Sequence, residues 1–513
     1  MQRYSPKTNK NVNITRLMTL RKIRIILASV MFIGLTLLFL DFTGTVYHWA
    51  GWMAKIQLLE AVLALNVVVV VALVALTLLL GRIYCSIICP LGILQDIFGW
   101  LGKKQKKNRY TYSKEMRWLR YGMLVVFLIA FLTGIGTLFQ LLAPYSTFGI
   151  IATNLLQPIY LGVNNILASI AEYYDSYMFY HSDVWMRSLP SFIISAVMLV
   201  ALFVLAWRNG RTYCNTICPI GTILALLSRF SWLKIHFDAD KCKNCSLCTK
   251  NCKAACIDYK THSVDYSRCI VCGDCISSCK FGALKYSRNT KNNENSQNNQ
   301  NAPIDNGKRA FLISSTLLAS AALAQQKEKM MDGGLAEIED KVAPTRQTLL
   351  TPPGSQSRKH FTQHCTGCQL CITECPNQVL RPSSDLLHWM LPTMSYERGY
   401  CRPECNHCSE VCPAGAIKPI KVEEKASTQI GHAVWIKKNC VVLTDEVECG
   451  NCARHCPSGA IEMVPSDPEN DESPYVPAVN EARCIGCGAC EYVCPARPFS
   501  AIYVEGHEVH KEV

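Results

Sequence analysis

The chain has 513 residues, half of them apolar, with 29 cysteines and a formal net charge of +13. The cysteines fall in groups of four at gaps of two or three residues, which is the spacing of metal ligands and excludes the disulfide scaffold of a short secreted protein. The basic runs lie beside apolar segments, a placement typical of membrane proteins rather than of nucleic-acid binding.

Four apolar segments precede residue 230 and approach or exceed the roughly 20 residues that span a bilayer: Ile25–Phe42, Leu58–Leu80, Tyr121–Leu142 and Ser191–Trp207. We therefore predict an α-helical membrane domain over residues 1–230, with four transmembrane helices, or five if a later segment also crosses.

Lysine and arginine are unevenly distributed between the loops. Residues 1–24 carry seven and residues 81–120 carry nine, whereas 43–57 has only Lys55 and 143–189 only Arg187. The positive-inside rule places the basic segments in the cytoplasm and predicts a multi-pass protein of the bacterial inner membrane.

One acidic residue, Glu60, lies in the second apolar segment, and His48 lies close to the same outer end. An acid inside a membrane is a functional candidate. Glu60 is the catalytic candidate, as acceptor of a quinol proton; the alternative is a residue among the lipid headgroups.

An internal repeat follows two of the apolar segments. Residues 81–92, GRIYCSIICPLG, match residues 210–221, GRTYCNTICPIG. The repeat predicts that four cysteines lie near each other at the inner membrane face: Cys85, Cys89, Cys214 and Cys218. Three roles fit them: binding a metal, exchanging electrons as a dithiol pair, or shaping a turn.

Residues 231–286 carry two cysteine runs with the spacing C-x2-C-x2-C-x3-C. In two-cluster ferredoxins, three cysteines of one run and the fourth of the other hold each [4Fe–4S] cluster. The expected ligands are Cys242, Cys245, Cys248, Cys252, Cys269, Cys272, Cys275 and Cys279. Cys256 competes with Cys252 as the distant ligand, and we favour Cys252.

Residues 325–513 contain four more groups, which predict a four-cluster domain: Cys365, Cys368, Cys371 and Cys375; Cys401, Cys405, Cys408 and Cys412; Cys440, Cys449, Cys452 and Cys456; Cys484, Cys487, Cys490 and Cys494. The pairing among these groups stays open. Structural zinc sites are the competing interpretation, but they favour isolated C-x2-C pairs. Both cysteine-rich regions are predicted to be α+β ferredoxin-like domains.

About six [4Fe–4S] clusters would change the charge balance. An oxidised core with four thiolates carries about −2, so six would bring the holoprotein close to neutrality. His364, His407 and His455 lie beside the cysteines, but each group already has four thiols. We therefore expect these histidines to form hydrogen bonds or to lie at the surface.

Residues 287–309 hold eight asparagines and predict a disordered linker. The 15-residue segment Ala310–Ala324 follows Lys308 and Arg309 and looks like a signal-type sequence or a fifth transmembrane segment. If it spans, the first cysteine-rich domain is cytoplasmic and the second lies outside, which is the arrangement we favour. If it lies on the surface, both are cytoplasmic.

The first 285 residues resemble the NapH family of membrane ferredoxin-type proteins, related to NosR and CcoG, through the two Tyr-Cys-x3-Cys-Pro-x-Gly segments and the following cysteine pair. Residues from about 308 onward resemble NapG through the signal-like segment, the four cysteine runs and the closing Cys494–Pro498 stretch. The resemblance implies quinol oxidation, with electrons passed through the clusters to an exported reductase.

We therefore expect an electron-transfer component that contacts membrane lipid, the quinone pool and a partner reductase or cytochrome, but no nucleic acid. The chain has no phosphate loop, nucleotide fingerprint or haem-attachment motif. The alternative function is a maturation or regulatory factor, in which the Cys-x3-Cys-Pro sites handle a metal.

Overall fold

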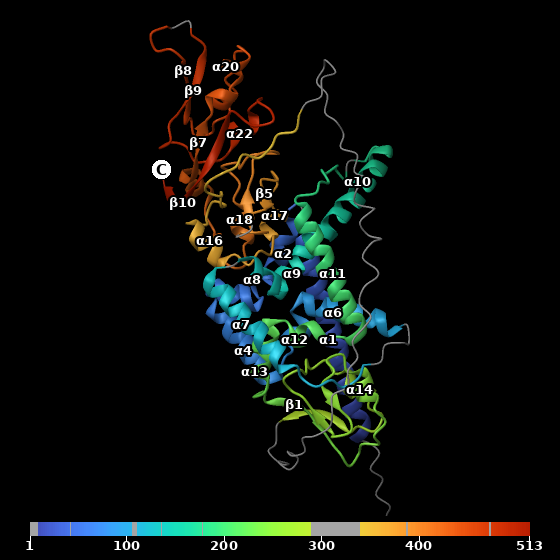
Figure 1. Ribbon diagram of the computed structural model, residues 1–513. Coiled ribbons are helices and arrows are strands. Elements are labelled where there is room, and N and C mark those ends of the chain that lie inside the picture. The colour runs from blue at the N-terminus through green and yellow to red at the C-terminus, as the bar shows by residue number, and fades with distance from the viewer. Residues whose placement is uncertain are drawn as a thin grey trace, which may run out of the picture.

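The computed structural model describes residues 9–41, 43–104, 110–134, 136–176, 178–288, 339–385, 388–470 and 473–512 (Figure 1). Almost all of the predicted linker and the whole segment 310–324 lie outside these ranges, so the fifth transmembrane segment stays a prediction. The described residues form a helical domain and three small cysteine-rich modules.

The helical domain takes up residues 9–228. Its elements are α1 (Asn9–Leu40), α2 (Thr45–Lys55), α3 (Leu58–Leu63), α4 (Val67–Leu80), α5 (Tyr84–Ile87), α6 (Pro90–Lys104), α7 (Arg117–Thr133), α8 (Gly136–Leu142), α9 (Pro144–Ile151), the π-helix η1 (Ala152–Leu156), α10 (Gln157–Tyr173), α11 (Leu189–Asn209), α12 (Thr212–Thr216) and α13 (Pro219–Ser228).

Two of the four predicted spans are not single helices. The segment Leu58–Leu80 breaks between α3 and α4, where Leu65 has a positive φ of 53° and the Asn66 side chain accepts a hydrogen bond from the backbone N–H of Val69. The segment Tyr121–Leu142 breaks at Gly134, whose φ is 74°. An asparagine N-cap begins a new helix and a left-handed glycine ends one, even within apolar sequence.

Among the described residues, two helical segments are long and apolar enough to cross a membrane, by length and composition: Arg21–Leu40 of α1 and Leu189–Asn209 of α11. Four or five transmembrane helices are therefore not established. The outer faces of the helical domain are nevertheless strongly apolar. Val68 of α4, Leu132 of α7 and Ile166 of α10 are 78%, 82% and 62% exposed.

The first module contains β1 (Leu233–Phe237), α14 (Leu247–Asn251), β2 (Ile257–Asp258), β3 (Ser263–Val264), α15 (Asp274–Ser278) and β4 (Leu284–Arg288). β1 and β4 pair antiparallel, from Leu233 with Arg288 to Phe237 with Leu284. Each cysteine run thus consists of a loop and a one-turn helix, bracketed by the pair of outer strands.

The predicted four-cluster domain divides into two modules. The second module contains α16 (Arg358–His364), α17 (Leu370–Thr373), β5 (Leu380–Pro382), β6 (Pro392–Met394), α18 (His407–Val411) and α19 (Val422–Ser427). The third contains β7 (Thr428–Trp435), the 3-10 helix η2 (Lys437–Asn439), α20 (Val441–Thr444), α21 (Asn451–Arg454), β8 (Ile461–Pro465), β9 (Tyr475–Val479), α22 (Ala489–Val493) and β10 (Ile502–Glu512).

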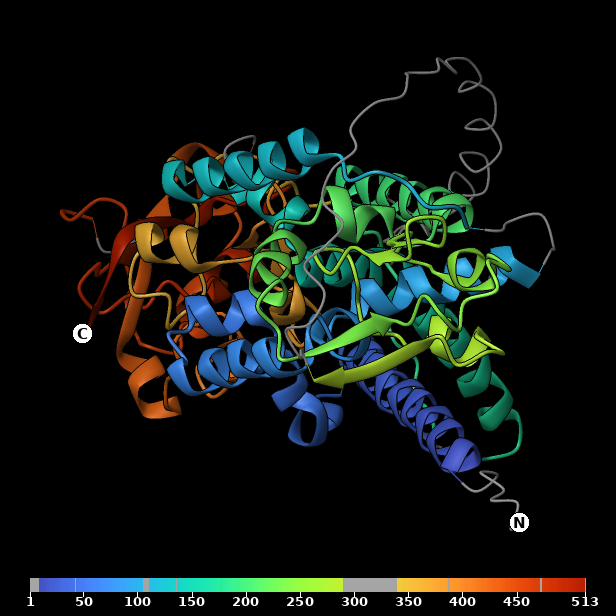
Figure 2. The ribbon, with the colours of Figure 1, turned by 90° about the horizontal axis from the view of Figure 1, so that it is seen from below.

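The first and second modules lie at opposite ends of the helical domain (Figure 1). Seen from the first module's end, β1 and β4 lie in front of the helices (Figure 2). At the other end, the Asn154 side chain donates to Gln369 at 2.8 Å, and the Tyr47 hydroxyl donates to the backbone of Glu410 at 2.5 Å. The third module lies beyond the second.

A carboxylate that is only 15% exposed, that of Asp96, fixes the first module to the helices. Asp96 of α6 accepts a hydrogen bond from Arg211 at 2.7 Å, and it pairs with Lys253 of the first module at 3.1 Å and with Arg24 of α1 at 3.6 Å. Burial alone would raise the pKa of Asp96, but the charges of Arg211 and Lys253 outweigh burial and hold that pKa well below its ordinary value.

Candidate metal centres

The first module brings its cysteines together crosswise, so that each group combines three cysteines of one run with the last cysteine of the other. Cys242, Cys245 and Cys248 line one small cavity together with Cys279 of the other run. The second group forms around Cys275, whose thiol lies within electrostatic reach of Cys252, Cys269 and Cys272. Three cysteines of one run thus meet the last cysteine of the other, as the spacing predicts.

Cys252 and Cys256 lie side by side, with 3.5 Å between their sulfur atoms. Their hydrogen bond lowers the pKa of Cys252 and raises that of Cys256, which also lies beside Cys269. Either sulfur could donate to the other, so the choice of Cys252 over Cys256 as the distant ligand stays a prediction.

The second module repeats the crosswise arrangement. Cys365, Cys368 and Cys371 all lie within electrostatic reach of Cys412. Cys375 lines a small cavity with Cys401, Cys405 and Cys408. Lys425 of α19 donates to the backbone oxygens of Arg402 and Cys405 and so fixes this second loop.

The third module also groups three cysteines of one run with the last cysteine of the other, although eight residues separate Cys440 from Cys449. Cys452 lies near Cys440, Cys449 and Cys494, while Cys484 and Cys487 lie near Cys456. The last four cysteine runs therefore pair as two modules of two groups each, which the sequence had left open.

The cysteine loops present backbone N–H groups to sulfur. Cys279 and Cys456 each accept a hydrogen bond at 3.3 Å from the N–H four residues later, and Cys494 accepts one at 3.3 Å from Ala501. Cys412 accepts one at 3.4 Å from Ile417. Such N–H···S bonds compensate the negative charge of a thiolate-bound cluster, so these residues fit [4Fe–4S] clusters.

All 29 cysteines are free. Within the described ranges, no group of three or more His, Cys, Asp or Glu side chains is arranged to hold a single metal ion. In a cubane cluster the four thiolates bind four separate iron atoms, and the open spacing of the cysteine groups is compatible with that arrangement.

The second and third modules touch at their cysteine loops. The backbone N–H of Cys401 donates to the carbonyl oxygen of Cys487 at 2.9 Å, and the two thiols are in electrostatic contact. Two candidate cluster sites therefore adjoin directly across the boundary between the modules.

The repeated Cys-x3-Cys-Pro segments meet inside the helical domain, as their similarity predicts. Cys85, Cys89, Cys214 and Cys218 are each 3–4% exposed. Cys89 lies within electrostatic reach of the other three. Their sequence did not indicate that Arg82 and Arg211, also fully buried, would lie among them.

Glu60 is 1% exposed and lies in α3 beside Thr366 and Cys368 of the second module. It does not line any of the described cavities. Two of the three flanking histidines form the expected hydrogen bonds: His364 and His455 bond to the backbone oxygens of His360 and Asn451, at 2.9 and 3.0 Å.

A cavity of about 580 Å³ separates the helical domain from the second module. Apolar residues line it together with Asn154 and Gln157 from the η1–α10 junction, His181, Asp183 and Arg187 from the following loop, and Cys375. Burial lowers the pKa of Arg187 to about 10, and within the described chain its Nη1 atom has no hydrogen-bond partner. Sequence reasoning missed this site because its residues are scattered.

The loop over this cavity is held by α10 and by the second module. Asn164 and Asn165 donate to the backbone oxygens of Tyr180 and Ser182, at 2.9 and 2.8 Å. Trp185 packs between the guanidinium groups of Arg381 and Arg398, which lie 4.7 and 4.6 Å from its ring centre. Trp185 therefore contributes to the contact between this loop and the second module.

Comparisons with known proteins match four stretches of the chain. A 4Fe-4S binding domain matches residues 62–108 and again 191–238, in agreement with the internal repeat. A second 4Fe-4S binding domain matches 262–285, and a 4Fe-4S dicluster domain matches 447–497.

Several relatives are named as ferredoxin-type or electron-transport proteins. The methylamine utilization ferredoxin-type protein MauM of Methylobacillus flagellatus is 31% identical over 170 residues, 31% of this chain and 70% of MauM. The ferredoxin-type protein NapF of Escherichia coli is 28% identical over 161 residues, 31% of this chain and 87% of NapF.

The putative electron transport protein YccM of Escherichia coli is 26% identical over 227 residues, 43% of this chain and 55% of YccM. These relatives support ferredoxin-type proteins in general. The more specific NapH–NapG resemblance stays an interpretation of the sequence.

Proposed function

Because the chain belongs to the ferredoxin-type iron–sulfur proteins, we propose that it is a membrane-bound conduit that oxidises quinol and passes the electrons to a partner protein. Electron transfer through [4Fe–4S] clusters is the general function of such proteins. The number of clusters, the membrane location, the quinol donor and the partner are the proposed parts.

Six clusters are proposed from the six crosswise cysteine groups. Each group has four thiols, and at least one sulfur in each of the three modules accepts a backbone N–H bond. When bound, the clusters supply one-electron carriers, and the hydrogen bonds and buried charges around each site tune its potential.

The exposed apolar surface supports insertion in a membrane. Large apolar side chains project outward from α1, α4, α7, α10 and α11, including Val30, Val71 and Val197 at 54%, 59% and 61% exposure. A soluble monomer rarely leaves so large a contiguous apolar surface in water. In the proposed orientation the first module is cytoplasmic and the second and third lie outside.

The proposal of quinol oxidation depends on one observation, the cavity of about 580 Å³ beside Cys375. Its size is that of a small-molecule site, and its lining combines apolar side chains, such as Leu161 and Phe192, with about as many polar ones. A quinol headgroup there would lie against a cluster ligand, so an electron would leave the ring directly toward the Cys375–Cys405 site.

Quinol oxidation also releases two protons, and the cavity offers acceptors for them. His181 lines the cavity and lies 3.5 Å from Glu172, and Asp183 lines it as well. The Arg187 guanidinium lies near Cys375 and Cys371, where its positive charge favours the reduced cluster. We propose this cavity, and not Glu60, as the quinol site.

Anaerobic protein in detergent tests this proposal. A short-chain quinol should bleach the visible iron–sulfur absorption, and His181→Ala should slow the bleaching at least tenfold without changing the iron content. His455→Ala, an exposed histidine in the third module, is the matched control. A wild-type protein that dithionite reduces but that quinol leaves oxidised would refute quinol oxidation.

Sidedness has its own test. Protease added outside oriented vesicles should cleave residues 339–512 and spare residues 233–288. Protection of the C-terminal modules would refute the two-sided orientation while leaving electron transfer intact.

A further inference from the structure

The first module lies off the direct path from the proposed quinol cavity to a partner outside the membrane. That cavity adjoins Cys375 of the second module, and the third module lies beyond the second. The first module lies at the opposite end of the helical domain (Figure 1). An electron from quinol can therefore reach an outside partner without entering the first module, so the two cysteine groups of that module require a role of their own.

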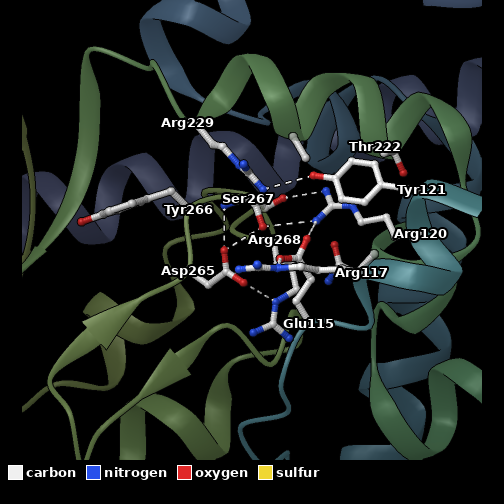
Figure 3. Close-up of polar contacts among 12 residues, drawn as sticks. Glu115, Arg117, Arg120, Tyr121, Thr222, Arg229, Asp265, Tyr266, Ser267 and Arg268 are labelled. Carbon is white, nitrogen blue, oxygen red and sulfur yellow. Dashed lines mark hydrogen bonds and ion pairs between the residues drawn. The ribbon is translucent and has the colours of Figure 1, made fainter. Parts of the chain in front are cut away.

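One of these two groups faces the helical domain. Its four cysteines, here called the inner group, are buried at 4–8% exposure: Cys252, Cys269, Cys272 and Cys275. The loop before Cys269 is bonded to the helices, because Arg82 and Arg120 both donate to the carbonyl oxygen of Ser267, at 2.9 and 3.1 Å. Figure 3 shows the Arg120 side chain reaching this loop. The helical domain therefore covers the inner group and leaves no room there for an external protein.

The other group reaches the surface of the module. It is here called the outer group and consists of Cys242, Cys245, Cys248 and Cys279. Cys245 is exposed, and it is the only one of the 29 cysteines, all within the described ranges, that is. Phe281 lines the same cavity and is 47% exposed. Exposed aromatic side chains are common anchors of protein interfaces, so this edge of the module can present a cluster to a partner.

Two unpaired lysines adjoin the outer group. Lys243 lies between Cys242 and Cys245 and lines their cavity, and Lys280 directly follows Cys279. Both lysines are exposed. Among the ion pairs of the described residues, none joins either lysine to a carboxylate. The rim of the outer group therefore carries two positive charges that the chain itself does not neutralise.

The aspartates near this edge are already matched by other lysines. Asp238 pairs with Lys241, and Lys285 lies within electrostatic reach of the same carboxylate. Asp240 is a second exposed acid beside Lys241. The positive charges of Lys243 and Lys280 are thus a surplus.

The first and third modules also differ in overall charge. Residues 233–288 contain ten Lys and Arg against five Asp and Glu, whereas residues 428–512 contain six against thirteen. Two clusters of about −2 in each module would leave the first slightly positive and the third strongly negative. The two ends of the chain therefore favour partners of opposite charge.

The inner side of the module shows what such a lysine binds. The two cysteine runs have the same spacing, so Lys253 follows Cys252 as Lys280 follows Cys279. Lys253 pairs with Asp96 of the helical domain at 3.1 Å. The lysine after the fourth cysteine is thus a docking contact on the inner side, and the group that it meets there is a carboxylate. Lys280 repeats this contact on the outer side, where the described chain supplies no carboxylate.

We propose that the outer group is the docking site of a small acidic electron-carrier protein, which gives the chain a second electron entry besides quinol. Carboxylates of the carrier pair with Lys243 and Lys280, and its redox centre lies against Cys245 and Phe281. In each encounter the reduced carrier loses one electron and the outer cluster gains it, with no bond formed or broken. The electron then passes to the inner group. The proposal rests on the proposed function only for the exit of these electrons.

Reduction kinetics test the proposal. Flavodoxin, an acidic one-electron carrier, is mixed in its hydroquinone state with the anaerobic full-length protein in detergent, and its oxidation to the semiquinone is followed by absorption. The rate should fall at least about tenfold between low salt and about 0.5 M salt, because salt screens the attraction between the two proteins. Lys243→Glu/Lys280→Glu should slow the low-salt reaction at least about tenfold, and Lys243→Arg/Lys280→Arg should keep the wild-type rate.

The matched control is Lys418→Glu/Lys438→Glu, which makes the same change in net charge at two exposed lysines of the second and third modules. It should keep the wild-type rate. A rate that is independent of salt and equal in all variants would overturn the proposal. So would lysine-dependent binding to vesicles of anionic phospholipid without any effect of the same lysines on the reaction with flavodoxin.

Cross-linking of the wild-type protein removes the dependence on a variant whose outer cluster could be damaged. A carbodiimide should join flavodoxin carboxylates to Lys243 or Lys280, as peptide mass spectrometry would show. Cross-links at Lys418 or Lys438 alone would overturn the proposal. Failure of quinol to reduce the clusters would refute the proposed function instead, since the reaction with flavodoxin is measured without quinol.

Discussion

Replacing Asp96 by asparagine tests how the first module is held on the helical domain. The substitution keeps the size of the side chain but removes the charge that faces Arg211, Lys253 and Arg24, at 2.7, 3.1 and 3.6 Å. Removing one partner of a buried ion pair typically costs about 3–5 kcal/mol, because the remaining charge stays buried. The side chain of Arg211 is fully buried, so we expect the Asp96→Asn protein to fall in this range.

Thermal unfolding of the detergent-solubilised protein would measure the effect, with an expected fall in Tm of roughly 5–10 °C. Because the pKa of Asp96 is depressed in the fold, its contribution is present above the unfolded value of about 3.9 and is lost only as the pH falls through the folded value. The loss of stability should therefore be constant between about pH 5 and 8. Asp238→Asn removes the exposed pair with Lys241 and should leave the Tm unchanged. Equal melting of the two variants would refute the role of Asp96.

Three further substitutions have expected outcomes. Gly92→Ala should destabilise the helical domain at the Cys-x3-Cys-Pro repeats, although alanine favours helices, because the methyl group would overlap the Cys85 carbonyl oxygen; a lower Tm would show it. Arg346→Met should cost about 3–5 kcal/mol of unfolding free energy, because it leaves the buried Glu491 without the two hydrogen bonds at 2.7 and 2.8 Å. Burial lowers the pKa of His510 to about 4, so the stability of the third module should fall by up to about 3 kcal/mol between pH 6.5 and pH 4, and His510→Gln should flatten that slope in acid titrations.

Each of these has a contrasting variant. Gly122→Ala, in open space on α7, should leave the Tm unchanged, and the same fall in Tm as in Gly92→Ala would contradict the steric argument. Arg358→Met breaks a largely exposed pair with Glu508 at 3.1 Å and should be nearly neutral. An unaltered pH slope in His510→Gln would show that another group titrates in that range.

Cysteine spacing predicted the module sites because cluster ligands are close in sequence, and the short loops leave few ways to close around a cubane. The pairing of the last four groups required the structure, since every run offers a fourth cysteine. The internal repeat likewise predicted the meeting of Cys85 and Cys214, but the burial of Arg82 and Arg211 among these cysteines has no sequence signal.

Hydropathy predicted the helical domain but not its breaks. Leu65 and Gly134 adopt left-handed conformations in apolar surroundings, and only local backbone geometry distinguishes such a break from a continuous helix. The cavity beside Cys375 was unpredictable for a related reason: a π-helix, a loop and a cysteine-rich module contribute to it, and no periodic pattern links them.

At Gly149 of α9 there is no room for a side chain, because a methyl group would overlap the carbonyl oxygen of Cys368. Main chain therefore abuts main chain where the helices meet the second module, and no flexible side chain can absorb a small displacement. Any residue larger than glycine at position 149 would therefore push the Cys368 loop away from α9 and lengthen the distance between the helices and the candidate cluster site of the second module.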